Sequence, residues 1–566
     1  MFNTRLNKRT APLFLLYIVL SSLCCYFQAS EVQASEYSQK DLNEEIVIAG
    51  NWQQHAPEYD ALFYQVFNTA RQNLPAALQK APEGKKLAIV TDIDDTLIDG
   101  TIYFTSLQGT DQSRSTERSI RWWSNQTTFA LPGTVRFFND VHKQGIEVFY
   151  ISGRFNEVKE VTFNRLKEFG FPVIDKEHIL LQETTNTILS KEGKRQSIRD
   201  RGYHILMAFG DQLSDLGEAP DHDYRLRRQW VIDNKAHFGN DWYLFPNTVY
   251  GAWEDSLAPG YSRMTPQEKH ERRLAALGAT RFHAITDKDY AQHLTLASVW
   301  THTSADFTAL CYQAYNRAEQ LINRMPAGSY NNPAIIADID GTVLDFTTIR
   351  ANLTDANDKM PVRFDHNWFL TEHQHSRPIP GAAEFLNSAS QKGYEIFYVS
   401  SRPLSKIPDS EDTDVESATI KKLTDYHFPY ADRQHVLLRE EHCSTRHKKH
   451  CGKELKRAAI QNGDIDNKKH DIVLMIGDLL SDFSLTEQQL DPRLKESAAT
   501  AASQFGNNYI ILPNPLNTVW MWQLYSREAQ KQNQELTQMS WKEQAELRRS
   551  LLLDWPEKWS HDRHSN

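Results

Sequence analysis

The chain has 566 residues, more than one typical domain, and this length predicts at least two domains. Hydrophobic residues make up 40% and charged residues 24% of it, which is ordinary for a soluble globular protein. The formal net charge is -10, so the chain lacks the basic field that a nucleic-acid polymer requires of its partner. We therefore expect no nucleic-acid polymer among its partners.

The start of the chain has the pattern of an export signal. Basic residues between positions 5 and 9 precede an apolar run from Ala11 to Leu23. The segment Val32-Gln33-Ala34 then offers small residues where a signal peptidase cuts. We predict that residues 1–34 are a signal peptide and that the mature protein is periplasmic or secreted.

Two other interpretations of this segment stay open. A retained membrane anchor is one, although the apolar run is shorter than the ~20 residues that span a bilayer as a helix. Lipid attachment at Cys24 or Cys25 is the other, but Leu23 stands where such a signal prefers a small residue. No later segment is long and apolar enough to span a membrane, so we expect no stable membrane span.

Three cysteines follow the signal segment. In an exported protein the close pair Cys443 and Cys451 predicts a small disulfide loop. The intervening His447 and His450 also permit a zinc site, but the spacing matches no common structural zinc pattern. Cys311 lies in an apolar stretch and is expected to be a small buried residue.

The chain contains the same pattern twice. Gly145–Ser152 (GIEVFYIS) returns as Gly393–Ser400 (GYEIFYVS). The spacing between these two segments exceeds the ~20–50 residues of solenoid repeats and indicates duplication of a whole domain. Further matches pair Trp52 with Trp300, Phe238-Gly239-Asn240 with Phe505-Gly506-Asn507, and Pro246-Asn247 with Pro513-Asn514.

Each copy alternates short apolar runs with amphipathic segments, which is the pattern of an α/β sheet. Residues 86–90 and 333–337 lack polar alternation and predict central parallel strands. Strands are also expected up to Ser152 and Ser400, and over residues 206–209 and 472–476.

These elements suggest a division of the chain. We assign residues 41–275 to a first domain and 285–530 to a second, each of the same fold. The boundary is expected in the charged stretch from 254 to 292, which Gly and Pro interrupt. Residues 531–566 form a polar, helix-prone tail.

The first predicted strand of each copy ends in two aspartates, Asp92 and Asp94, then Asp338 and Asp340. Close carboxylates repel each other, and a divalent cation would relieve that repulsion. Open α/β sheets also bind ligands outside the carboxyl ends of their strands. If only one such pair were present, an ordinary turn with two aspartates and no ligand would be an equally good interpretation.

Other polar residues follow in the same order in both copies. Taken singly, a serine at a strand end is usually a cap, and a helix lysine is usually solvated. Four elements in a fixed order, present twice, instead predict one composite site per copy. These residues are Ser152, Lys191, Asp211 and Asp215 in the first copy, and Ser400, Lys453, Asp478 and Asp482 in the second.

This ordered set resembles the four motifs of haloacid-dehalogenase (HAD) phosphatases, and more narrowly the bacterial class C acid phosphatases of HAD subfamily IIIB. The narrower likeness also uses Trp52-Gln53-Gln54, Glu58-Tyr59, Tyr103 and the run from Pro246 to Trp253. It covers the first copy well and the second somewhat less well. The resemblance implies an α/β fold of two tandem Rossmann-like domains, each a mostly parallel sheet flanked by helices with a small cap.

The resemblance also implies a function and a mechanism. It points to an exported, magnesium-dependent acid phosphatase acting on small phosphate monoesters, with 5′-nucleotides among the candidates. The nucleophiles would be Asp92 and Asp338, forming an aspartyl-phosphate, with Asp94 and Asp340 as acid and base. Mg²⁺ would be held by Asp92, the backbone carbonyl of Asp94 and Asp211, and in the second copy by Asp338, Asp340 and Asp478. Asp215 and Asp482 would support the metal through a water, and Ser152, Lys191, Ser400 and Lys453 would bind the phosphoryl oxygens.

The sequence departs from the class C pattern in places that bear on substrate preference. Gln212 and Leu479 stand where an Asn usually follows the Gly-Asp pair, and Asp95 and Gly341 replace a usual Glu. The second copy has Asn517-Thr518 where the first has Tyr250-Gly251. An alternative is therefore one active domain with the second a non-catalytic scaffold or binding module. A storage protein is the other rival, but plant storage relatives lack the nucleophile that Asp92 and Asp338 would supply.

The connection between the first two motifs is too short for a large cap domain. It contains Trp122-Trp123 in the first copy and Trp368 in the second, which could stack on an aryl group but more often serve packing. The segment from Pro403 to Cys451 is longer than its counterpart and either shapes access to the second site or is a solvated excursion. The sequence predicts no oligomeric state.

Overall fold

We describe the protein from a computed structural model. The described residues are 37–125, 128–183, 190–278, 288–326, 328–345, 376–404, 414–441, 452–483 and 497–553. The predicted signal peptide, Trp368 and the Cys443–Cys451 pair with its two histidines lie outside them. Within the described part, no helix is both long and apolar enough to cross a membrane.

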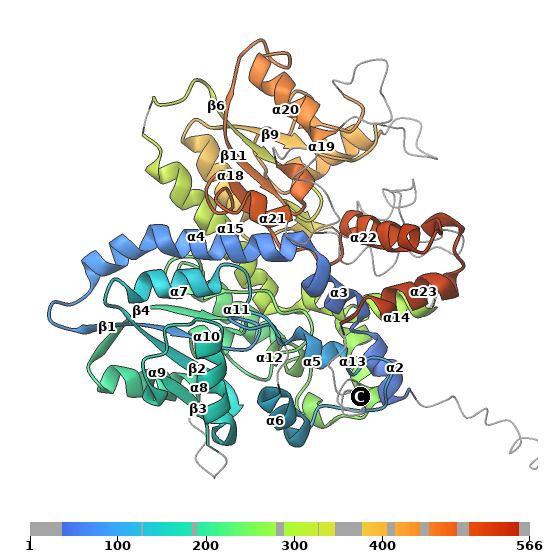
Figure 1. Cartoon of the computed structure of the whole chain (residues 1–566). Helices are drawn as coiled ribbons and strands as arrows, with labels where there is room; N and C mark the ends of the chain where they lie inside the picture. Colours follow the sequence, from blue (N-terminus) through green and yellow to red (C-terminus); the bar gives the residue numbers. More distant parts are fainter. Residues whose placement is uncertain are drawn as a thin grey trace, which may run out of the picture.

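The first repeat is built on a five-stranded parallel sheet in the order β3-β2-β1-β4-β5. The apolar run predicted for the first strand forms its centre, because four of six positions in β1 are buried. Helices cover both faces of this sheet (Figure 1). The strands are β1 (Lys86–Thr91), β2 (Glu147–Phe155), β3 (Ile179–Gln182), β4 (Tyr203–Gly210) and β5 (Trp242–Leu244).

The second repeat has a five-stranded parallel sheet in the equivalent order, β10-β9-β6-β11-β12. The fold class predicted from the sequence is therefore confirmed, and the duplication extends to the sheet topology. The strands are β6 (Pro333–Ala337), β9 (Glu395–Val399), β10 (Val436–Leu437), β11 (Asp471–Gly477) and β12 (Tyr509–Ile511). A small antiparallel pair joins β7 (Leu344–Asp345) to β8 (Arg377–Pro378).

The helices of the first repeat begin before its sheet, and two short ones, α5 and α6, follow β1 where a small cap was predicted. They are α2 (Gln39–Glu44), α3 (Val47–His55), α4 (Pro57–Lys80), α5 (Thr101–Thr105), α6 (Thr116–Ser124), α7 (Thr134–His142), α8 (Lys159–Glu168), α9 (Lys191–Asp200), α10 (Leu213–Leu216), α11 (Tyr224–Asp233), α12 (Ala252–Asp255) and α13 (Pro266–Ala276). Short 3-10 turns are η1 (Asn156–Val158), η2 (Lys176–His178) and η3 (Tyr261–Arg263).

The helices of the second repeat follow the same plan around its sheet. They are α14 (Lys288–Thr303), α15 (Ala305–Arg324), α18 (Ala382–Gln391), α19 (Val415–Asp425), α20 (Lys453–Asn462), α21 (Ser497–Thr500), α22 (Thr518–Lys531) and α23 (Trp541–Ser550). The 3-10 turns are η5 (Leu480–Asp482) and η6 (Leu536–Gln538). Cys311 is fully buried within α15, as its apolar surroundings predicted.

The long helices α4 and α15 join the two repeats, and α4 runs between the two sheets (Figure 1). Gln65 of α4 donates to the carbonyl of Ile511 at 2.9 Å and accepts from its N–H at 2.8 Å, which completes the edge strand β12. Gln313 of α15 makes the same two bonds to Leu244 of β5, at 2.9 and 2.8 Å. Each repeat therefore uses a glutamine of its own helix to satisfy the edge of the other repeat's sheet.

This exchange follows an approximate two-fold symmetry. Trp52 and Trp300, equivalent residues of the two repeats, are both fully buried and lie with ring centroids 6.4 Å apart. At Gly506, with φ +76, an added Cβ would lie 2.8 Å from the backbone oxygen of Gln65, and Gly239 meets Gln313 in the same way at 3.1 Å. Glycine is needed there because the turn is left-handed and the helix approaches closely.

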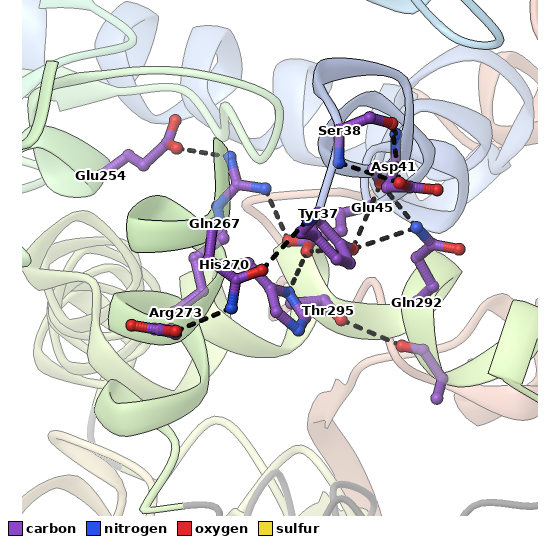
Figure 2. Close-up of polar contacts among 12 residues, drawn as sticks. Tyr37, Ser38, Asp41, Glu45, Glu254, Gln267, His270, Arg273, Gln292 and Thr295 are labelled. Atoms are coloured by element: carbon purple, nitrogen blue, oxygen red, sulfur yellow. Dashed lines mark hydrogen bonds and ion pairs between the residues drawn. The ribbon is translucent and has the colours of Figure 1, made fainter. Parts of the chain in front are cut away.

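The expected boundary stretch is held to the start of the first repeat by a buried polar cluster (Figure 2). Glu45, which is fully buried, accepts from Arg273 of α13 at 2.6 Å and lies 2.5 Å from the His270 ring. Arg273 also contacts Glu254 at 2.5 Å, and Tyr37 donates to Glu45 at 2.8 Å. A buried guanidinium shared by two carboxylates satisfies charges that would otherwise be costly to bury.

The polar segment after residue 531 folds back onto the first repeat. Helix α23 buries Leu547 and Arg548, and Arg549 pairs with Glu44 of α2 at 2.7 Å. The backbone N–H of Leu553 donates to Gln54 of α3 at 2.9 Å. The described part of this segment, up to residue 553, therefore packs against the start of the first repeat.

Candidate active sites

The strand ends of the first sheet bring three carboxylates together. Asp92 directly follows β1, and its backbone N–H donates to Phe209 of the neighbouring β4 at 2.9 Å. Ligand oxygens of Asp92, Asp211 and Asp215 all lie within 4.8 Å of one another, and the three residues are buried. Gly210 allows this approach, because a Cβ there would lie 2.1 Å from the Cβ of Asp215.

Lys191, the first residue of α9, enters this carboxylate cluster. Its ammonium nitrogen lies 2.9 Å from an oxygen of Asp92 and also pairs with Asp215. The lysine predicted to contact the phosphate therefore forms ion pairs with two aspartates. Burial disfavours the charged ammonium, but Asp215 and Asp92 raise the pKa of Lys191 above its ordinary value.

The electrostatics of the site depend first on burial. Burial raises the pKa of Asp92 well above its ordinary value, Lys191 opposes this effect, and the neighbouring aspartates add to it. Burial, followed by the charges of Asp215 and Asp95, raises the pKa of Asp211 to about 7. Such a cluster is destabilised by its own charge and would be stabilised by a cation.

Asp94 faces an arginine that the sequence reasoning missed. Arg154 of β2 donates to both carboxylate oxygens of Asp94, from Nε at 2.8 Å and from a terminal nitrogen at 2.7 Å. Its side chain is fully buried, so this two-pronged pair fixes the plane of the carboxylate. Arg154 follows Ser152 by two residues, and Arg402 follows Ser400 likewise, so extending the repeat comparison by two positions would have found both.

A cavity of about 500 Å³ opens over these residues. Asp92, Asp94, Ser152, Lys191 and Asp211 line one part of it. Much of the remaining wall is aromatic, and the Tyr250 ring stacks on Phe104 with centroids 3.9 Å apart. The aromatic lining residues are Tyr103, Phe104, Trp122, Trp123, Phe155 and Tyr250.

The tryptophans differ in their roles within this wall. Trp122 is 2% exposed and packs beside Tyr103, so it serves the core as well as the cavity. Trp123 is only partly buried and lies against Phe155 at the cavity, with the Arg154 guanidinium over its ring. Trp122 is therefore part of the core packing, and both tryptophans line the cavity.

The second sheet assembles the same set. Ligand oxygens of Asp338, Asp478 and Asp482 lie within 4.8 Å of one another, and all three residues are buried. Lys453, the first residue of α20, pairs with Asp338 and lies 2.6 Å from Asp482. Burial raises the pKa of Asp338 well above its ordinary value, and burial together with Asp482 raises the pKa of Asp478 to about 7.

The acid–arginine pair and the strand-end serine are repeated as well. Arg402 donates to both oxygens of Asp340, at 3.1 and 2.9 Å. Ser400 is buried and accepts from the backbone N–H of Arg402 at 3.1 Å, the distance at which Ser152 accepts from Arg154. All the residues predicted for each site are therefore brought together at the carboxyl end of one sheet.

One contact crosses from the first repeat into the second site. Glu58 of α4 accepts from the backbone N–H of Leu480, the first residue of the 3-10 turn that carries Asp482. The equivalent residue of the second repeat, Asp306, instead pairs with Arg227 at 3.1 Å. The sequence pattern did not reveal this asymmetry.

Either carboxylate cluster could hold a divalent cation. The donors available are carboxylate oxygens, which suit a hard cation such as Mg²⁺ or Ca²⁺ better than zinc. Thr96 and Thr342 donate to the inner oxygens of Asp211 and Asp478, at 3.3 and 3.4 Å, and help to orient both carboxylates. The residues present therefore fit the metal that the fold implies.

Comparison with known proteins identifies the family of the chain. The model of HAD superfamily, subfamily IIIB (acid phosphatase), matches residues 10–253 and again 271–520. The chain belongs to this family. Both repeats are thus copies of the subfamily IIIB domain, as the sequence motifs predicted.

Individual relatives match over shorter stretches. Vegetative storage protein 1 of Arabidopsis thaliana is 32% identical over 145 residues, which is 24% of this chain and 52% of that protein. Acid phosphatase 1 of Solanum lycopersicum is 27% identical over 133 residues, which is 22% of this chain and 51% of that protein. The chain spans about half the length of the curated relatives it matches. A class C acid phosphatase of Bacillus anthracis, solved with tungstate bound, is 34% identical, with 42% of this chain and 97% of that chain covered and a TM-score of 0.39.

Proposed function

We propose that the chain is an exported, magnesium-dependent acid phosphatase that hydrolyses phosphate monoesters through an aspartyl-phosphate. The single observation that supports this best is the buried lysine shared by two aspartates at the carboxyl end of both sheets. Subfamily membership supports the reaction class. Residues 1–34 would direct export, and residues 41–275 and 285–530 would be the two catalytic domains.

In the proposed reaction a carboxylate oxygen of Asp92 attacks phosphorus, and the bond from phosphorus to the ester oxygen breaks. Asp94 gives a proton to the departing oxygen and then takes one from the water that attacks the aspartyl-phosphate, releasing inorganic phosphate and free Asp92. Arg154 holds the Asp94 carboxylate in place for both steps. Lys191 and Ser152 would bind the phosphoryl oxygens, and phosphate binding would compete with the Lys191–Asp215 contact.

The metal would be held by Asp92, the backbone carbonyl of Asp94 and Asp211. Bound Mg²⁺ supplies charge neutralisation, which lets a carboxylate approach a phosphate dianion. Asp215 would not bind the metal directly, but would act through its contact with Lys191 and through a water. The same roles fall to Asp338, Asp340, Asp478 and Asp482 in the second site, with Lys453 and Ser400 on the phosphate.

The aromatic wall of the first cavity supports a substrate with an aryl or nucleoside leaving group. Stacking between flat rings contributes about 0.5–1.5 kcal/mol beyond simple burial. Tyr250 and Phe104 present such a surface beside the catalytic aspartates. We therefore place 5′-nucleotides and aryl phosphates among the substrates of the first site.

The test compares Asp92→Asn, Asp338→Asn and the double variant on 5′-nucleotides and aryl phosphates, with and without Mg²⁺. The double variant should lose turnover entirely while retaining its fold by circular dichroism. Full activity in the double variant would overturn the nucleophile assignment. In the single variants, loss of all activity with Asp92→Asn alone would make the second repeat a scaffold, and residual activity would come from Asp338.

A further inference from the structure

In the first site, two side-chain amides hold one oxygen of Asp211, the carboxylate proposed to bind the metal. Asn247 donates to Oδ2 of Asp211 at 2.7 Å, and Gln212 donates to the same oxygen at 2.9 Å. The other end of the Gln212 amide is also engaged, because its oxygen accepts from the backbone N–H of Ala252, the first residue of α12, at 3.1 Å. One amide thus orients the carboxylate and caps a helix.

The second site has lost that glutamine. Leu479 occupies the position of Gln212 and has no side-chain donor to offer. Asn514, the counterpart of Asn247, still donates to Oδ2 of Asp478 at 2.7 Å. From these equivalent positions alone, the Asp478 carboxylate is therefore expected to accept one hydrogen bond fewer than the Asp211 carboxylate.

The missing donor comes from a different part of the chain. Asn517 donates from Nδ2 to Oδ2 of Asp478 at 2.7 Å. Its oxygen accepts from the backbone N–H of Val519 at 2.9 Å, and Val519 is the counterpart of Ala252. Asn517 therefore makes the same pair of contacts as Gln212, although it stands at the position equivalent to Tyr250.

We infer that Asn517 is the positioning residue for the cation-binding carboxylate of the second site, where it replaces the function of Gln212. This inference deepens the proposed function and rests on it. Two amides on Oδ2, together with Thr342 on Oδ1, restrict rotation of the Asp478 carboxylate within the acidic cluster.

The exchange also changes the wall of the site at one position. In the first site position 250 carries the Tyr ring that stacks on Phe104 in the cavity wall. In the second site the equivalent position is occupied by an amide turned toward Asp478. The two sites therefore differ at this position in the surface that they offer to a ligand.

A purely local role for Asn517 is the competing explanation, because it is the N-cap of α22. The two roles separate by substitution. Asn517→Ser keeps a good capping oxygen but removes the long amide donor. The triple variant Leu479→Gln, Asn517→Tyr and Thr518→Gly rebuilds the first-site arrangement in the second site, because a Cβ at the position of Gly251 would lie 2.3 Å from the Gln212 amide.

Mg²⁺ binding is measured by calorimetry in a chain carrying Asp211→Asn, so that only the second site binds. Asn517→Ser should weaken Mg²⁺ binding by about 10- to 100-fold, the usual cost of losing a residue that orients a metal ligand. Its helix content and its unfolding temperature without metal should stay close to the parent's. Asn517→Tyr should show the same loss, and addition of Leu479→Gln together with Thr518→Gly should recover most of the affinity.

Unchanged Mg²⁺ affinity in Asn517→Ser would overturn the inference, as would a folded triple variant that recovers nothing. Absence of Mg²⁺ binding to the parent would overturn it too. If the parent binds Mg²⁺ through Asn517 but the chain hydrolyses no phosphate ester, the proposed function fails and the positioning role stands.

Discussion

Glu58 in the first repeat accepts a hydrogen bond from the backbone N–H of Leu480 in the second, at 3.1 Å. This contact anchors the turn that carries Asp482, and Asp482 in turn pairs with Lys453. Glu58 is 4% exposed, and burial raises its pKa to about 7, with a further contribution from the charge of Asp482. The first repeat therefore contributes a titratable residue to the surroundings of the second site.

Replacing Glu58 with Gln should change how stability depends on pH. The folded-state pKa of about 7 lies above the ordinary 4.5, so the carboxyl stabilises the fold fully below pH 4.5 and loses this contribution as pH rises through 7. The loss amounts to about 3 kcal/mol. Urea unfolding with EDTA at pH 5 and pH 8 should therefore show a smaller drop for Glu58→Gln than for the natural chain. An identical drop in both proteins would contradict this account.

Removing the charge of Asp306 should destabilise the junction between repeats. Arg227 and Asp306 pair at 3.1 Å with side chains 0% and 2% exposed, so Asp306→Asn leaves a buried guanidinium without its counter-ion. Breaking such a pair costs about 3–5 kcal/mol. The matched control is Asp289→Asn, whose partner Arg549 is partly exposed, with an expected cost below about 1 kcal/mol. If urea unfolding shows that Asp306→Asn costs as little as Asp289→Asn, the junction pair is unimportant for stability.

The reciprocal glutamines should have equal effects on stability. Gln65→Leu removes two hydrogen bonds to Ile511, and Gln313→Leu removes two to Leu244, in each case leaving a buried backbone N–H and C=O unsatisfied. Each variant should lose about 2–4 kcal/mol in urea unfolding. The double variant should lose the sum, since the two contacts share no partner. A neutral result for one glutamine alone would show that the two repeats do not share their edges symmetrically.

The arginine beside each acid–base aspartate should not tolerate lysine. Arg154→Lys exchanges two fixed hydrogen bonds to Asp94 for at most one flexible contact, so the carboxylate loses its orientation. We expect kcat/KM to fall about 10- to 100-fold, because misplacing a reacting group is costly. The assay uses Asp338→Asn chains, so that only the first site turns over.

Two further variants make this arginine test specific. Arg402→Lys in Asp92→Asn chains should show the equivalent loss at the second site, because Arg402 holds Asp340 in the same way. Arg165→Lys, on the exposed pair with Glu168, should leave activity unchanged. An Arg165→Lys loss as large as that of Arg154→Lys would mean that the effect is not specific to the site.

Much of this protein could be predicted from the order of its residues alone. The repeated segments revealed the duplication, and buried runs such as residues 86–90 and 333–337 indicated parallel sheets. Polar residues at successive strand ends predicted the two carboxylate clusters, because the carboxyl ends of parallel strands meet at one edge. These inferences succeeded since strand pattern and strand-end chemistry are local properties of the chain.

Other features were decided only by the tertiary structure. Position-by-position comparison of the repeats showed Leu479 and Asn517 as departures, yet their joint effect is visible only where both meet Asp478. The Glu58–Leu480 contact likewise joins residues 422 positions apart, and the reciprocal glutamines contact residues 446 and 69 positions away. A hydrogen bond depends on the distance between two atoms in space, and the same oxygen can be reached from different places in the chain. The sequence by itself therefore determined which chemical groups each site contains, whereas the packing of the two repeats determined which residue holds each group in place.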